Sequence, residues 1–214
     1  MENTDQASLE FLRTHSACGD GFDWAIQNGN IAGWWTACPH GDWLIWFVTH
    51  LGVDSKKVIR AAMACADLAY PFLTEKEVDA RDGLETVNTW LDEKTGIQAL
   101  GKAGRLADEA FVNANLRGDT SAAFAVKSIA CVIKAAFWID KDRYRANQFA
   151  SKTCTWAAEA AGAASDPNGM DRQEVIEQLH QACADRVRAL IPESEVSEPV
   201  KIYLESRNEP IPTR

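Results

Sequence analysis

The sequence predicts an all-α protein: one compact domain of about seven or eight helices over residues 1–191, then an extended, proline-containing tail over residues 192–214. Apolar residues recur at the helical spacing of three and four along most of the domain. Two capping boxes mark helix starts, and an alanine-rich stretch adds strong helix formers. The alternation typical of a strand occurs only in the tail.

The N-terminal third is expected to hold short helices over residues 5–17 and 22–27, followed by a tryptophan-rich helix. A Pro-His-Gly segment interrupts the chain before this third helix. Asp42 follows the interruption and can cap a helix that begins at Trp43.

Three helices are expected in the middle of the chain. The first covers residues 55–70 and ends at Pro71. Thr74 and Glu77 then form a capping box for a helix that runs to about Asp92. The third covers residues 97–116, before an Arg-Gly-Asp break.

An alanine-rich stretch over residues 120–164 predicts one long helix, or two helices with a break at residues 140–142. A Ser-Asp-Pro-Asn-Gly loop at residues 165–169 follows, and a second capping box opens a helix over residues 171–191. The tail has four prolines, five acidic residues and one alternating patch at residues 200–204. It predicts either a loosely ordered segment or an extended arm that packs on its own domain or on a neighbouring subunit.

Composition narrows the classes of function. The chain has 31 acidic and 22 basic residues and a formal net charge of −9. A nucleic-acid polymer is not an expected partner, because such binders cluster lysine and arginine. No run reaches the roughly 20 apolar residues of a membrane span, so a cytoplasmic protein without a membrane partner is expected.

The six cysteines are scattered and form no Cys-x-x-Cys pair, which is typical of reduced thiols. Cys38 and His40 could supply two ligands to zinc, but His15, His50 and His180 do not complete a standard spacing. Neither a metal nor another cofactor is therefore expected.

Four of the eight tryptophans fall within residues 34–47. Trp43, Trp46, Phe47 and His50 share one face of the expected helix, so this aromatic stripe must be buried somewhere. Burial in the domain's own core is the simpler interpretation. A binding surface is the alternative, because tryptophan is enriched among interface hot spots.

Polar residues on neighbouring helices suggest a candidate ligand site. Arg60 and Asp67 share one helix face, and Arg81 and Glu85 form an i, i+4 pair on the next helix. They are either solvated ion pairs or the polar side of an aromatic pocket. The candidate ligand- or partner-binding set is Trp35, His40, Asp42, Trp43, Arg60, Asp67, Arg81 and Glu85.

No recognised catalytic motif or phosphate-binding loop is present in the sequence. An enzyme that uses Asp42, Asp67 or Glu85 as an acid or base remains a third-ranked hypothesis.

The order of several motifs resembles the immunity proteins of the Imm-5-like group, whose members occur in bacteria and in phage genomes. The most specific part is Cys38-x-x-Gly41-Asp42-Trp43-x-x-Trp46, and the similarity extends over residues 17–192. His40 stands where many relatives carry arginine, and the tail is an addition. Other carriers are the segments Arg60-Ala61-Ala62-x-Ala64-Cys65-Ala66, Glu85-x-x-x-x-Trp90 and Cys183-Ala184-Asp185-x-Val187-Arg188-x-Leu190-Ile191-Pro192.

The resemblance implies toxin neutralisation and assigns no catalytic residue. The leading hypothesis is a non-enzymatic binding protein that neutralises a bacterial toxin or a host defence component. The second is capture of a nucleotide-derived immune signal between Trp35, Trp43, Arg60 and Arg81, because indole stacking with arginine contact can hold a base and a phosphate. The alanine-rich helices and the tail also make a homo-oligomer plausible.

Overall fold

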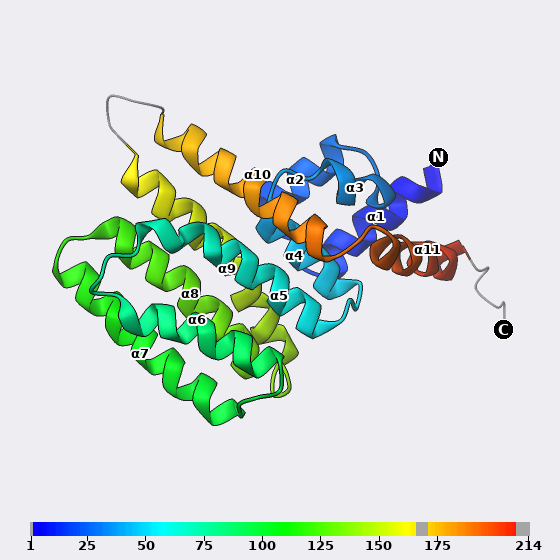
Figure 1. Cartoon of the computed structure of the whole chain (residues 1–214). Helices are drawn as coiled ribbons and strands as arrows, with labels where there is room; N and C mark the ends of the chain where they lie inside the picture. The colour runs from blue at the N-terminus through cyan, green and yellow to red at the C-terminus, as the bar shows by residue number, and fades with distance from the viewer. Residues whose placement is uncertain (1, 166–170, 209–214) are drawn as a thin grey trace.

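A computed structural model describes residues 2–165 and 171–208 of the chain. The described residues form eleven α-helices, one short 3₁₀ helix and no strand, which confirms the all-α prediction but exceeds the expected seven or eight helices (Figure 1). The helices are α1 (Glu2–Thr14), α2 (Gly19–Gln27), α3 (Ile31–Ala37), α4 (Gly41–His50), α5 (Ser55–Ala66), η1 (Asp67–Phe72), α6 (Val78–Leu91), α7 (Ile97–Leu116), α8 (Thr120–Trp138), α9 (Arg143–Ala164), α10 (Arg172–Leu190) and α11 (Ser194–Asn208).

Helix α8 lies at the centre of the domain and packs against α5, α6, α7 and α9. Its alanines are buried and let these neighbours approach closely. Among the described helices, α8 alone has the length and hydropathy of a membrane span. The sequence analysis expects no membrane-spanning helix. Two thirds of its apolar window (67%) is buried by other helices, as is usual for the core helix of a bundle.

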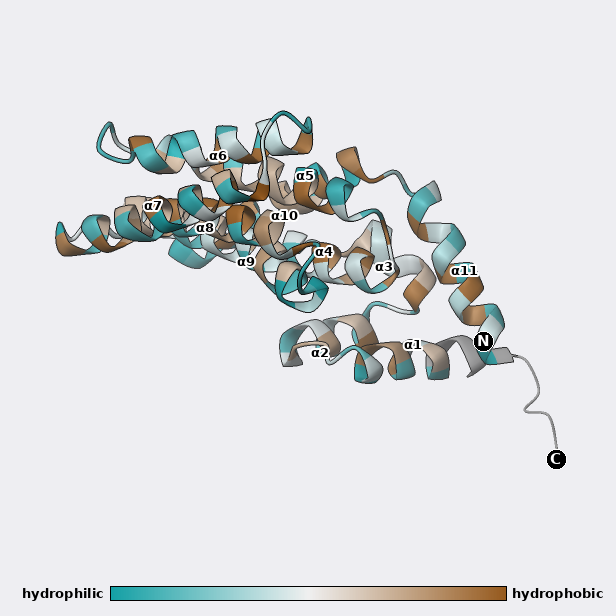
Figure 2. Ribbon diagram, turned by 90° about the horizontal axis from the view of Figure 1, so that it is seen from below, coloured by the Kyte–Doolittle hydropathy of each residue, from teal (hydrophilic) through white to brown (hydrophobic). Residues whose placement is uncertain are grey.

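Helices α4, α5 and α10 all pack against α9, and α4 and α5 also pack against α10. Figure 2 shows α1 and α2 on one side of this group and α6 on the other. The approach of α4 to α10 depends on Gly41, because a Cβ atom there would lie 2.5 Å from the Cβ atom of Cys183. This contact fixes the N-terminal end of α4 against the middle of α10.

The C-terminal segment corrects the prediction of an extended tail. Residues 194–208 form α11, which packs on α1 and α3 despite a proline at position 199. Val196 and Val200 are buried and Tyr203 and Leu204 are half-buried, whereas Ile202 is exposed. The apolar positions therefore follow helical spacing, and this periodicity outweighs the strand-like alternation of residues 200–204.

The expected break near residues 140–142 is confirmed, because α8 ends at Trp138 and α9 begins at Arg143. Asp142 caps α9 by accepting a hydrogen bond from the backbone N–H of Arg145 (3.1 Å). Apart from Ser165, the predicted loop at residues 165–169 lies outside the described residues.

The other predicted caps need correction. α4 begins at Gly41, so Asp42 lies in its first turn and is not its cap. Asp171 precedes α10 but forms no side-chain cap hydrogen bond.

At residues 74–77 half of the expected capping box forms. The Glu77 carboxylate accepts from the backbone N–H of Thr74 at 2.8 Å, but α6 begins only at Val78. Glu77 is also buried and ion-paired with Arg117.

Candidate functional site

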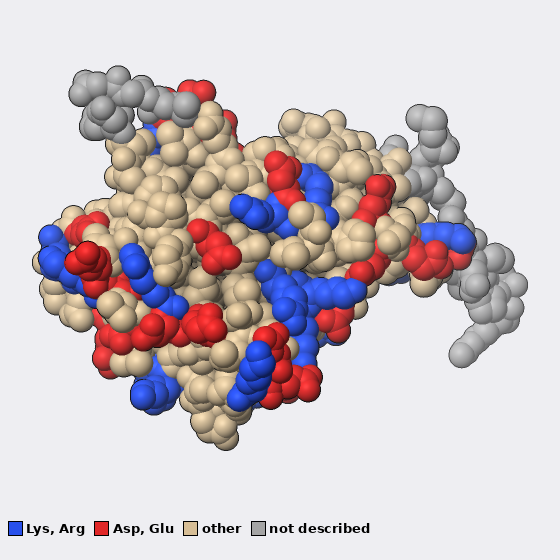
Figure 3. Space-filling model, viewed as in Figure 1, with Lys and Arg blue, Asp and Glu red and all other residues tan. Residues whose placement is uncertain are grey.

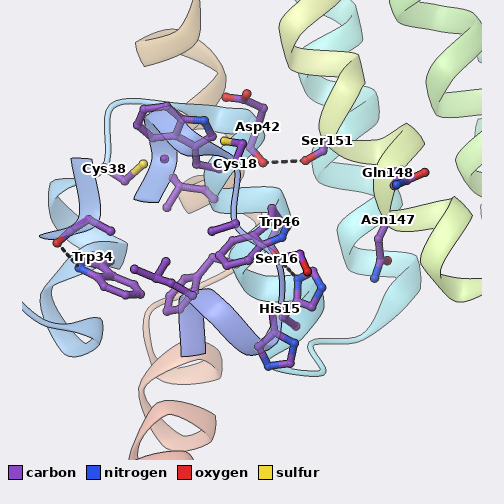
Figure 4. A pocket seen from close by; sticks show the side chains of 18 of the residues that line it. His15, Ser16, Cys18, Trp34, Cys38, Asp42, Trp46, Asn147, Gln148 and Ser151 are labelled. Carbon is purple, nitrogen blue, oxygen red and sulfur yellow. Dashed lines mark hydrogen bonds between the residues drawn. The ribbon is translucent and has the colours of Figure 1, made fainter. Parts of the chain in front are cut away.

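A cavity of about 290 Å³ lies between α4 and α9 and is also lined by residues of α1, α2, α3 and the turn between α1 and α2 (Figure 4). We call it the aromatic pocket, because tryptophan and phenylalanine form most of its apolar wall. Its lining residues are Leu12, His15, Ser16, Ala17, Cys18, Gly21, Trp24, Ala25, Trp34, Cys38, Asp42, Trp43, Leu44, Trp46, Phe47, His50, Tyr144, Asn147, Gln148, Ser151, Lys152 and Thr155.

The apolar wall comes largely from one face of α4. Trp43, Trp46, Phe47 and His50 all line the pocket, so the stripe predicted from the sequence is real. Phe47 is buried in the core, whereas Trp43 and Trp46 are only half-buried. The stripe therefore contributes to the core and lines a cavity, and its use as a binding surface stays a prediction.

The opposite wall is polar and comes from α9. Tyr144, Asn147, Gln148, Ser151 and Lys152 lie on one face of this helix and line the pocket. The hydroxyl of Ser151 donates to the backbone carbonyl of Asp42 at 2.8 Å, which ties α9 to the first turn of α4. Among the described residues, the side-chain amides of Asn147 and Gln148 form no hydrogen bond; Asn147 is half-buried and Gln148 is exposed.

Sequence reasoning did not find this polar wall. The feature of the sequence that could have indicated it is a row of polar residues at helical spacing within the alanine-rich stretch. A polar row of this kind is more often simply the solvated face of a helix.

Two histidines form one end of the pocket. The rings of His15 and His50 lie 4.6 Å apart, and Nδ1 of His50 contacts the backbone carbonyl of Trp46 at 2.8 Å. Burial and the neighbouring His50 lower the pKa of His15, and burial lowers the pKa of His50. Both rings are therefore favoured in the neutral form, which suits an apolar cavity.

A second polar group lies beside the pocket, where α4 meets α10. Oδ1 of Asp42 lies 3.3 Å from Nδ1 of His180 and 3.8 Å from Nδ1 of His40. The His40 ring stacks on Trp43 with 3.9 Å between ring centroids. Burial opposes protonation of His180, but the Asp42 carboxylate outweighs it and raises the pKa of His180, whereas burial and His180 lower the pKa of His40.

Three cysteines meet one helical turn further along α10. Cys65 of α5, Cys154 of α9 and Cys183 of α10 are fully buried, and their sulfur atoms all lie within 4.8 Å of one another. Hydrogen bonds from the thiols of Cys154 and Cys65 lower the pKa of Cys183. This group is not among the residues predicted from the sequence, because the three positions are far apart along the chain.

The structure brings together three of the eight predicted site residues. His40, Asp42 and Trp43 are in mutual contact, and Asp42 and Trp43 line the aromatic pocket. Trp35 is buried in α3, and its backbone carbonyl accepts a hydrogen bond from Arg188 at 2.9 Å.

The other four predicted residues do not line the pocket. Arg60 lies 3.9 Å from Asp92, and Arg81 donates to the backbone carbonyl of Leu73 at 3.0 Å. Asp67 and Glu85 are exposed. These charged residues therefore do not form the polar side of this cavity.

Comparisons with known protein families, with curated proteins and with solved structures find no match to this chain. The resemblance to the Imm-5-like immunity proteins therefore stays a prediction.

Proposed function

We propose that this protein is a non-enzymatic binding protein that captures a small, planar, uncharged heterocycle of the nucleobase or nucleoside class in the aromatic pocket. The observation that supports the proposal is that an aromatic wall and a polar wall lie on opposite sides of the same cavity. Trp43 and Trp46 line the cavity from α4, and Asn147 and Gln148 line it from α9. Indole faces can stack on a planar ring, and side-chain amides can read its polar edge.

The size and charge of the pocket support a small, neutral ligand. A cavity of about 290 Å³ lies just below the usual range for ligand sites, which is roughly 300–1,000 Å³. Among the residues that the structure describes, Lys152 is the one lysine or arginine in the lining, since Arg60 and Arg81 lie elsewhere. A polyphosphate would lack the clustered cations that usually bind it. The expected signal molecule is thus nucleotide-derived but without a chain of phosphates.

The test is isothermal titration calorimetry of the full chain with adenosine, guanosine and their 5′-triphosphates. Nucleoside binding at one site per chain is expected, with no gain in affinity for the triphosphates. Trp46→Leu should weaken binding roughly 5- to 150-fold, because stacking of one base on an aromatic side chain is worth about 1–3 kcal/mol. Trp90→Leu is the matched control, because Trp90 is also a half-buried tryptophan but does not line the pocket.

Asn147→Ala tests the polar wall in the same way, with Asn88→Ala as its control outside the pocket. Absence of nucleoside binding, or equal loss in the pocket and control variants, would contradict the proposal. Much tighter binding of the triphosphates would contradict the assignment of an uncharged ligand.

Neutralisation of a bacterial toxin or defence protein is the second proposal. It is supported by the net charge of −9 and by the resemblance of residues 17–192. Acidic and basic side chains alternate on the face in Figure 3, so the excess of acid is not gathered there into one patch. Native mass spectrometry of protein recovered gently from a bacterial lysate separates the two proposals. A protein partner adds tens of kilodaltons, whereas a captured heterocycle adds a few hundred daltons.

Catalysis by Asp42, Asp67 or Glu85 stays a hypothesis with less support, because Asp67 and Glu85 do not line the pocket that Asp42 reaches. Substitution of each carboxylate by its amide would test it, provided that a turned-over substrate is found.

A further inference from the structure

The three-cysteine group differs from the other cysteines of the chain. A buried free cysteine usually behaves as a small hydrophobic residue, and Cys131 of α8 fits that description. Cys65, Cys154 and Cys183 instead converge from three separate helices at one point. Within the described part of the chain, the Cys65 thiol donates a hydrogen bond to the backbone carbonyl of Cys183, at 3.6 Å. This convergence of three thiols is typical of the ligands of a metal ion.

The spacing of the sulfurs suits one metal ion. A Zn–S bond of about 2.3 Å in tetrahedral geometry places two sulfur ligands about 3.8 Å apart. The three sulfurs already lie within 4.8 Å of one another, so rotamer adjustments of the order of 1 Å complete the set. Thiolates select zinc, monovalent copper or iron–sulfur clusters over hard cations.

The candidate fourth ligand lies on the same helix, outside the group of three sulfurs that lie within 4.8 Å of one another. His180 precedes Cys183 by three positions on α10, so the two side chains share a helix face. Oδ1 of Asp42 lies 3.3 Å from Nδ1 of His180, which leaves Nε2 for a metal. A carboxylate that holds the other nitrogen of a histidine is the usual outer shell of a zinc ligand. His180 is also buried, with 8% of its surface exposed, as expected for a structural site.

We propose that Cys65, Cys154 and Cys183 bind a zinc ion as thiolates, with His180 as the fourth ligand and Asp42 as the carboxylate that orients it. Each thiol releases its proton to solvent as its bond to zinc forms. Zinc leaves one net negative charge on the set, whereas monovalent copper would leave two. The smaller buried charge favours zinc, since an uncompensated charge is costly in a protein interior.

The test starts from the full chain, reduced and stripped of metal with a chelator. Titration with Zn(II) against a competing chromophoric chelator should give one site per chain, and native mass spectrometry should show one retained ion. Cys154→Ala should abolish this site, and His180→Ala should weaken it at least tenfold, in line with the usual loss on removing part of a zinc shell. Cys131→Ala, which removes a buried cysteine outside the group, should leave binding unchanged.

A second measurement guards against variants that fail to fold. Wild-type protein loaded with Co(II) should show thiolate-to-cobalt charge-transfer absorption, and added Zn(II) should displace it. Absence of stoichiometric zinc binding by the wild-type chain would overturn the proposal. Cobalt spectra without thiolate bands, or a disulfide within the group in protein alkylated before reduction, would overturn it as well. The zinc titration contains no nucleoside, so a failed nucleoside titration leaves this proposal untouched.

Discussion

Gly41→Ala probes the contact that fixes α4 against α10. A Cβ atom at this position would lie 2.5 Å from Cβ of Cys183, 2.9 Å from its carbonyl carbon and 3.0 Å from the backbone nitrogen of Ala184. Carbon atoms in contact normally sit about 3.5–4.0 Å apart, so the two helices must separate by about 1 Å. Two of the three obstructing atoms are backbone, and no change of rotamer can relieve the overlap.

The expected cost follows from this geometry. Overpacking of a well-filled core destabilises by about 1–3 kcal/mol. For a domain of this size, each kcal/mol shifts Tm by roughly 2–4 °C. Gly41→Ala should therefore lower Tm by about 2–12 °C.

Gly33→Ala is the matched control, because Gly33 also lies in a helix but no atom lies within 4 Å of its added Cβ. This variant should gain up to about 1 kcal/mol from helix propensity. Urea denaturation and differential scanning calorimetry measure both variants. Equal stability of the Gly41 and Gly33 variants would refute the close approach of α4 to α10.

Two further predictions concern buried charge and pH. Arg117→Met leaves the carboxylate of Glu77, which is 1% exposed, without its ion-pair partner, and should lower the free energy of unfolding by about 2–3 kcal/mol. Arg145→Met, which removes an exposed ion-pair partner, should lower it by less than about 0.5 kcal/mol in the same urea denaturation. Comparable losses in the two variants would contradict the argument. The pKa values of His15 and His50 are lowered in the folded state, so their contribution to stability is complete above pH of about 6.5 and is lost as pH falls below it. His15→Asn should reduce the loss of stability between pH 7.5 and pH of about 5.5, and an unchanged loss in denaturation at the two pH values would count against these pKa directions.

The sequence predicts the aromatic wall of the pocket well, because the wall lies on one helix. Trp43, Trp46, Phe47 and His50 are neighbours on α4, so helical periodicity alone places them on one face. The facing amides of Asn147 and Gln148 are about a hundred residues further along the chain. Their position depends on the packing of α4 on α9, which periodicity does not encode.

The error in the C-terminal segment has a different cause. Val200, Ile202 and Leu204 alternate like a strand, while Val196, Val200 and Tyr203 follow helical spacing. The two patterns share Val200, so the segment fits two periods, and the surrounding fold decides between them. α1 and α3 present a surface that buries Val196 and Val200, which favours the helix.

The charged residues of the predicted site illustrate the limits of helix-face arguments. Arg81 and Glu85 do share a helix, but Arg81 turns to the backbone carbonyl of Leu73. Arg60 instead approaches Asp92, just beyond the end of α6. A shared face shows which side chains can meet, and it does not show which cavity they reach.

Asp42 connects the two proposed sites. Its backbone carbonyl accepts the hydroxyl of Ser151 on the polar wall of the pocket, and its carboxylate contacts His180 beside the three cysteines. A metal bound to His180 would therefore also restrict the position of Asp42. Because Asp42 is hydrogen-bonded to Ser151, the metal would in turn fix the distance between α4 and α9, which sets the width of the pocket. Zinc would then act on ligand binding by fixing the cavity, without touching the ligand. Trp46→Leu should weaken ligand binding and leave zinc binding unchanged, because Trp46 lies in the pocket and outside the cysteine group. Cys154→Ala should remove the zinc and, through Asp42 and Ser151, weaken ligand binding as well.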